Sequence, residues 1–123
     1  MSRFFYYNRN PDGNEITDCV CRAISAATGL SYRATYRLLG MAADRYGCDK
    51  LCACCYSHLL TGWLGYKKYY CKNGEIVNDI VEKHKDSKII IRIDRHLTFA
   101  LYGVLADIWD CGEREVDCYW IVD

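Results

Sequence analysis

The 123-residue sequence has one proline, no excess charge of either sign and no long apolar run. Sixteen basic residues balance sixteen acidic ones, which argues against a nucleic-acid binder, because such proteins gain much of their affinity from a basic surface. No apolar stretch approaches the length of a membrane span, and the patch Phe4–Tyr7 is too short for a signal peptide. We therefore expect one globular domain, residues 1–123, with neither nucleic acid nor membrane among its partners.

Cysteine, by contrast, is abundant. The chain has nine cysteines, an odd number, so complete internal pairing in disulfides is impossible. Without a signal peptide, the simplest setting is a reducing cytosol in which the thiols stay free. Most of these cysteines should then pack as small hydrophobic residues, which leaves at least one for chemistry.

The hydrophobic pattern divides the chain into a helical part and a strand-rich part. After the turn signal in residues 10–14, apolar residues at helical spacing predict helices up to about residue 85, one of them capped by Ser31. From residue 88 the pattern becomes β-branched and alternating. Strands are predicted at 66–71, 88–93, 96–102, 104–110 and 115–122. The expected fold is α+β, with N-terminal helices packed on a C-terminal antiparallel β-sheet.

Cys19 stands where the first predicted helix begins. Thr17 or Asp18 fits the N-cap position, which places Cys19 in the first helical turn. Free amide hydrogens and the helix dipole at this position favour the thiolate, the nucleophilic form of cysteine. The alternative is a buried cysteine that only happens to begin a helix. Cys21 points about 200° around the helix from Cys19 and is expected to pack in the core.

A cysteine nucleophile needs a base, and the sequence offers three histidines. His84 lies in a charged run that is typical of a solvated surface. His58 lies on the apolar stripe of a predicted helix, where a hydrogen-bonded core histidine is commoner than a base. His96 begins a predicted strand directly after a turn, and we therefore take it as the candidate base.

The hairpin that follows His96 offers two carboxylates to orient it. If Gly103 is the centre of the turn, so that its two neighbours face each other, His96 faces Asp110 with the Cβ atoms about 5 Å apart. A register shifted by one residue brings Asp107 onto the face of His96 instead. Asp110 is the first choice and Asp107 the alternative, unless both are surface charges at strand ends.

Together these residues resemble the papain-like cysteine proteinase superfamily in a minimal form. The order of motifs is the same: Asp18-Cys19-Val20-Cys21-Arg22-Ala23 begins the first helix, His96-Leu97-Thr98 begins a strand, and Asp107-Ile108-Trp109-Asp110 follows on the next strand. The likeness covers residues 12–122 and is to small proteins of phages and mobile elements, and more distantly to bacteriocin-leader (double-glycine) peptidases. In that superfamily the cysteine heads the first central helix, and the histidine and its partner lie on the sheet.

The resemblance implies a role for each residue. Cys19 would attack a carbonyl, His96 would take and return the proton, and an aspartate would orient the imidazole. The superfamily usually has a Gln or Asn before the cysteine that helps to bind the oxyanion. Asn14 is the nearest candidate here, together with the amide of Cys19, although its spacing is one residue short.

A group of cysteines in the middle of the chain raises zinc binding as an alternative. The residues concerned are Cys48, Cys52, Cys54, Cys55 and His58. A structural zinc site usually takes four ligands from two C-x-x-C pairs, and only one such pair is present. That pair lies in a predicted helix, whereas a thioredoxin-type redox pair follows a strand. We therefore expect no metal and no other cofactor.

The eleven tyrosines and three tryptophans favour a binding protein as the alternative function. Tyr66, Tyr69 and Tyr70 lie beside Lys67 and Lys68, and exposed aromatic and basic side chains often anchor a protein partner. A catalytically inactive papain-like protein, such as a phage-encoded inhibitor of a host factor, would fit this composition. Tyrosines at the rim of a small core would also explain it.

The sequence thus predicts a cysteine-dependent hydrolase, a thiol peptidase or deconjugating enzyme that acts on peptide or isopeptide bonds. Its catalytic residues would be Cys19, His96 and Asp110, with Asp107 as the alternate and Asn14 in the oxyanion hole. The expected partner is a peptide or protein substrate, or a host protein. The expected location is the cytoplasm, that of the host if a phage encodes the protein.

Overall fold

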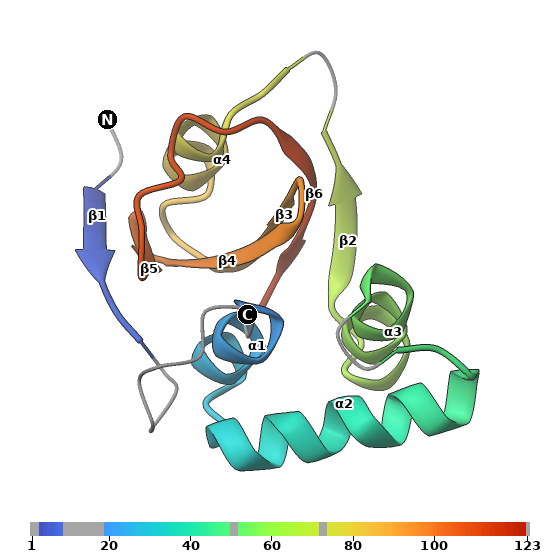
Figure 1. The fold of residues 1–123 in the computed structure, drawn as a ribbon. Coiled ribbons are helices and arrows are strands. Elements are labelled where there is room, and N and C mark those ends of the chain that lie inside the picture. The colour runs from blue at the N-terminus through green and yellow to red at the C-terminus, as the bar shows by residue number, and fades with distance from the viewer. Residues whose placement is uncertain (1–2, 9–18, 50–51, 72–73, 123) are drawn as a thin grey trace.

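A mixed β-sheet forms the centre of the computed structural model, which describes residues 3–8, 19–49, 52–71 and 74–122 (Figure 1). Its six strands are Arg3–Tyr6 (β1), Lys67–Tyr70 (β2), Lys88–Ile93 (β3), His96–Leu101 (β4), Val104–Asp107 (β5) and Val116–Ile121 (β6). They lie in the order β1-β5-β4-β3-β6-β2. Neighbouring strands are antiparallel except β1, which the sequence pattern did not predict and which pairs with β5 in parallel.

The helices of the described residues lie mostly before the strands in the sequence. They are Cys19–Thr28 (α1), Tyr32–Tyr46 (α2), Ala53–Ser57 (α3) and Val77–Lys83 (α4), and a π-helical segment, His58–Trp63 (η1), continues α3. Ser31 caps α2 as predicted, because its Oγ accepts a hydrogen bond from the Ala34 amide at 3.1 Å. None of the helices in these residues is long and apolar enough to cross a membrane.

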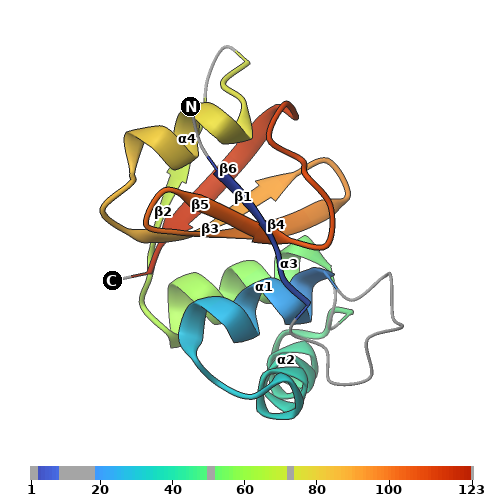
Figure 2. The same ribbon diagram turned by 90° about the vertical axis from the view of Figure 1, so that its left-hand side faces the viewer.

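Helices cover both faces of the sheet, because successive side chains of a strand point to opposite faces. Ile89 and Ile91 of β3 pack in a core with α4, whereas Ile90 between them packs in a second core with α1, α2 and α3. Figures 1 and 2 show α4 on one side of the curved sheet and the other helices on the opposite side. The predicted α+β fold, with helices first and strands after them, is confirmed.

The hairpin of β4 and β5 has a register one residue away from the predicted one. Leu101 pairs with Val104, so Tyr102 and Gly103 form a two-residue turn. Both have positive φ, 48° and 84°, as in a type I′ turn. The turn is therefore centred between them and not on Gly103. As a result, β5 ends at Asp107 and presents the opposite set of side chains to each face.

Candidate active site

The candidate nucleophile and base come from two layers of the fold that pack against each other. Cys19 is the first residue of α1, and His96 is the first residue of β4, the strand on which α1 lies. The Cys19 thiol and the His96 imidazole line the same cavity and interact closely enough to shift each other's pKa. The structure thus brings together the two residues that the sequence singled out from nine cysteines and three histidines.

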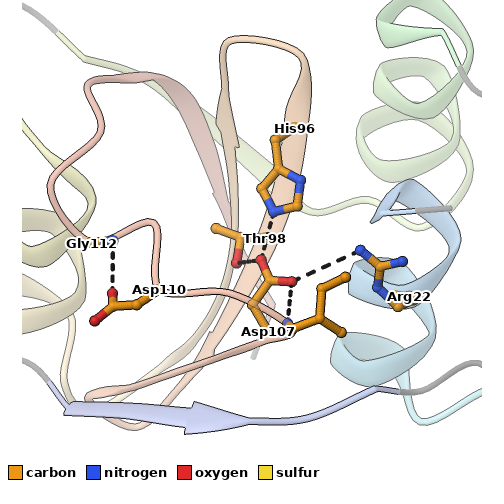
Figure 3. Close-up of polar contacts among 7 residues, drawn as sticks. Arg22, His96, Thr98, Asp107, Asp110 and Gly112 are labelled. Carbon is orange, nitrogen blue, oxygen red and sulfur yellow. Dashed lines mark hydrogen bonds and ion pairs between the residues drawn. The ribbon is translucent and has the colours of Figure 1, made fainter. Parts of the chain in front are cut away.

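Asp107, and not Asp110, binds the imidazole. Nε2 of His96 lies 2.6 Å from Oδ2 of Asp107 (Figure 3). Asp110 lies beyond the end of β5, is exposed, and accepts a hydrogen bond from the Gly112 amide at 3.0 Å. The predicted contact between His96 and Asp110 is therefore wrong, because the type I′ turn shifts the register by one residue. Asp107, the alternative, takes that place.

Several donors fix the carboxylate of Asp107, whose side chain is 5% exposed. Thr98 Oγ1 donates a hydrogen bond to Oδ2 at 2.6 Å, and the Ile108 amide donates to Oδ1 at 2.7 Å. The Arg22 guanidinium lies 4.0 Å from Oδ1. Because a carboxylate only accepts hydrogen bonds, Nε2 of His96 carries the proton toward it. The second ring nitrogen, which points away from Asp107 toward α1 in Figure 3, is left for the thiol.

The thiol and the imidazole change each other's pKa. Burial raises the pKa of Cys19. Hydrogen bonding to His96 and to the Leu97 backbone lowers it, and so does the charge of His96. Together these effects outweigh burial and leave the pKa of Cys19 below its usual value. Burial lowers the pKa of His96, and its hydrogen bonds with Asp107, Cys111 and the thiol raise it to about 11. Both shifts favour a thiolate beside an imidazolium at neutral pH.

Trp109 covers the imidazole. The two ring centroids lie 5.0 Å apart, with the planes tilted by 50°. The His96 side chain is only 10% exposed, whereas Trp109 is 38% exposed. The indole therefore keeps water away from the hydrogen bond between His96 and Asp107, which strengthens that bond.

A cavity of about 230 Å³ opens beside Cys19 and His96. Its walls come from the start of α1, from Tyr56 of α3 and from the β3–β4 hairpin with Arg92 and Arg95. The first-turn amides of α1 have no partner within the helix and suit a developing negative charge. Asn14, which we predicted for the oxyanion hole, lies outside the described residues.

Three of the contacting residues were not predicted from the sequence. Thr98 lies two residues after His96 and so shares its strand face, and Arg22 lies one helical turn after Cys19. These spacings are signals that could have identified both residues. Cys111 offers no such signal, because it reaches His96 only through the turn after β5.

One set of residues in the described part of the chain has the spacing of metal ligands. His96, Asp107 and Cys111 each offer a ligand atom within 4.8 Å of the others. The Asp107 oxygens, however, already accept three hydrogen bonds, and the Arg22 guanidinium adds positive charge beside them. A cation would have to displace these donors, so the set fits an orienting carboxylate better than a metal centre.

The cysteines of the alternative zinc site lie together where α2 leads into α3. The thiols of Cys52 and Cys54 lie close enough to Cys48 to raise its pKa, together with burial. Cys55 is fully buried and donates its thiol proton to the Leu39 carbonyl at 3.4 Å. His58 stacks on Tyr46 instead, with the ring centroids 3.9 Å apart. Two of the five proposed ligands therefore have other contacts.

Comparisons with family models, with curated proteins and with solved structures found no match to this chain.

Proposed function

We propose that the protein is a papain-like cysteine hydrolase, a peptidase or deconjugating enzyme that cleaves peptide or isopeptide bonds. One observation carries the proposal: Cys19 and His96 line the same cavity, and Nε2 of His96 lies 2.6 Å from the buried carboxylate of Asp107. A nucleophile, a base and a group that orients the base, in this order, are the parts of a catalytic triad.

The reaction would begin with attack of the Cys19 thiolate on the carbonyl carbon of the scissile bond. The new S–C bond moves the carbonyl electrons onto oxygen, where the first-turn amides of α1 stabilise the charge. The His96 imidazolium then gives its proton to the leaving amine as the C–N bond breaks, which leaves a thioester on Cys19. Neutral His96 next takes a proton from water, whose oxygen attacks the thioester; the S–C bond breaks and releases the acid, which leaves the Cys19 thiolate beside the His96 imidazolium.

Asp107 would act through His96 in every step. Its carboxylate keeps the proton on Nε2, so the other ring nitrogen remains the one that gives a proton to, or takes a proton from, the reacting atoms. The carboxylate also stabilises the imidazolium that waits beside the thiolate. We place Asp107, rather than Asp110, in the third role for this reason.

The proposed substrate is a peptide or protein, and the proposed setting is the cytoplasm, that of the host if a phage carries the gene. A thiolate nucleophile works only while it is reduced, which a cytosol ensures. All nine cysteines are free thiols in the structure.

Limited alkylation tests the proposal without a known substrate. Iodoacetamide at less than one equivalent and pH 6.5, followed by peptide mass mapping, should label Cys19 first, because its lowered pKa leaves more thiolate than ordinary cysteines have. Cys54 is exposed and serves as the internal reference. The preference should disappear in His96→Gln. Equal labelling of Cys19 and Cys54 in the wild type would contradict the proposal that the protein is a cysteine hydrolase.

Exposed aromatic residues support the second candidate, an inactive papain-like binding protein that blocks a host factor. Phe5 and Tyr6 on the edge strand β1 are 58% and 62% exposed, and Tyr70 on the opposite edge strand β2 is 71% exposed. Tyr69, in contrast, stacks on Tyr119 and is half-buried. Such a protein would show no preferred thiol in the alkylation experiment.

A further inference from the structure

Two arginines line the cavity beside Cys19 and His96. Arg92 lies near the end of β3, and Arg95 lies in the turn that leads into His96. No acidic side chain lines this cavity in the part of the chain that the structure describes. The two guanidinium groups give this wall of the cavity positive charge.

Arg95, which lines the cavity, has an unfavourable backbone conformation. Its φ is 59°, in the left-handed region, where a Cβ atom meets the backbone. The turn has only two residues between Ile93 and His96, so the strand pairing enforces this conformation. The guanidinium is exposed and has no hydrogen bond or ion pair with any other described residue. Strain of this kind at an otherwise unpartnered charge is typical of a binding position.

Arg92 has contacts within the protein but remains available to bind a ligand. Its guanidinium lies 3.8 Å from the Asp117 carboxylate, in a pair whose side chains are 38% and 53% exposed and which water therefore screens. Arg92 also interacts with Tyr56, which lines the same cavity. Burial raises the pKa of Tyr56 to about 12, so the hydroxyl keeps its proton and adds a donor to the cavity wall.

We infer that this cavity binds a carboxylate of the substrate through Arg95 and Arg92, so that the enzyme selects peptides with a carboxylate close to the scissile bond. The inference rests on the proposed function and names its substrate class. An acidic side chain and the carboxylate at the end of a chain offer the same chemistry to the two guanidinium groups.

Two alkylating reagents that differ by one carboxylate test the inference. Iodoacetate and iodoacetamide react by the same step, in which the thiolate forms an S–C bond and iodide leaves. We would measure both rates at Cys19 and compare their ratio between wild type and Arg95→Gln. The iodoacetate to iodoacetamide ratio should fall about 3- to 10-fold, as expected on removal of one partly exposed charge. His96 carries the same charge in the wild type and in Arg95→Gln, so its effect on the rate ratio cancels in the comparison.

Two control variants make the result specific. Arg95→Lys keeps the charge and should keep the ratio within about twofold of wild type. Arg45→Gln removes an exposed charge on α2, outside the cavity, and should leave the ratio unchanged. An unchanged ratio in Arg95→Gln, with Cys19 still the fastest thiol, would overturn the carboxylate subsite and leave the proposed function standing. If the ratio falls in Arg95→Gln but Cys19 is not alkylated faster than Cys54, the carboxylate subsite is supported and the proposed hydrolase function is refuted.

Competition distinguishes the two sources of the carboxylate. N-acetyl-alanine carries only a terminal carboxylate, N-acetyl-aspartic acid α-amide carries only a side-chain carboxylate, and N-acetyl-alaninamide carries neither. Protection of Cys19 from iodoacetamide by the first compound assigns the subsite to a chain end, and protection by the second assigns it to an acidic side chain. If neither of the two carboxylate compounds protects Cys19 better than N-acetyl-alaninamide does, the inference is overturned.

Discussion

Replacement of Asp107 by asparagine removes the charge that orients His96 and keeps the shape of the side chain. The carboxylate accepts hydrogen bonds from His96, Thr98 and the Ile108 amide. An asparagine has one oxygen and one NH₂ group, so at least one of these donors would face another donor. If the NH₂ group faces His96, the imidazole proton moves to Nδ1, and the ring can no longer accept the proton of Cys19.

The size of the effect follows from these contacts. Loss of one hydrogen bond to a buried charged group costs about 1.5 to 3 kcal/mol of folding free energy, or about 5 to 12 °C in melting temperature for a domain of this size. Without the carboxylate the pKa of His96 falls, and the imidazolium charge that lowers the pKa of Cys19 is weakened. The Asp107 charge itself raises the pKa of Cys19, but by less than the His96 charge lowers it, so the pKa of Cys19 should rise. Each unit of that rise lowers the thiolate fraction about tenfold. Hydrolysis should fall on the order of 10³- to 10⁴-fold, because the tautomer is wrong.

The assay is the rate of Cys19 alkylation by iodoacetamide at pH 6.5, with the melting temperature measured in parallel by circular dichroism. Asp110→Asn is the matched control, since Asp110 is exposed and the asparagine oxygen can still accept the hydrogen bond from the Gly112 amide. We expect Asp107→Asn to lose both reactivity and stability and Asp110→Asn to behave as the wild type. Normal reactivity in Asp107→Asn with loss in Asp110→Asn would refute the register and the role of Asp107.

Three further predictions concern pH, the turn and metal. The pKa of His96 is raised from 6.5 to about 11 in the folded state. In a Cys19→Ser background, which removes the part of this shift that the thiol causes, its contribution to stability, measured as the melting difference from His96→Gln, should be full below about pH 6.5 and decline as the pH rises through the raised pKa. Gly103→Ala should lower the free energy of unfolding by about 1 kcal/mol, because φ is 84° there, whereas Gly103→Asn should be better tolerated; chemical denaturation measures both. Protein purified without chelator should hold no stoichiometric zinc by mass spectrometry, and EDTA should not change its melting temperature. One zinc per chain with unfolding by EDTA would instead assign the ligands of a metal site to the group Cys48, Cys52, Cys54, Cys55 and His58.

Local signals explain what the sequence could predict. The N-cap at Ser31, the helix that begins at Cys19 and the β-branched run of β3 each depend on residues within one element. The choice of Cys19 and His96 followed from their positions at the starts of such elements. Cys21 is fully buried, as predicted from its direction on the helix.

The remaining features depend on contacts that one element does not encode. The usual signal of a type I′ turn is Asn-Gly or Asp-Gly, and Tyr102-Gly103 does not give it, so the register and the choice between Asp107 and Asp110 went wrong. The parallel pairing of β1 with β5 joins residues far apart in the sequence. His84, predicted at the surface from its charged neighbours, is half-buried with Nε2 3.0 Å from the Tyr119 hydroxyl.

The strand directions decide where this protein can be attached to a surface or to a fusion partner. Arg3 pairs with Val104, and the Val122 amide donates to the Lys88 carbonyl, so both ends of the described chain lie at the end of the sheet that carries the β4–β5 turn. His96 lies at the opposite end of β4, about 17 Å along the strand. A biotin or an affinity tag attached at Arg3 or Val122 would therefore lie far from the cavity beside Cys19, and immobilised protein can be used to measure peptide binding directly.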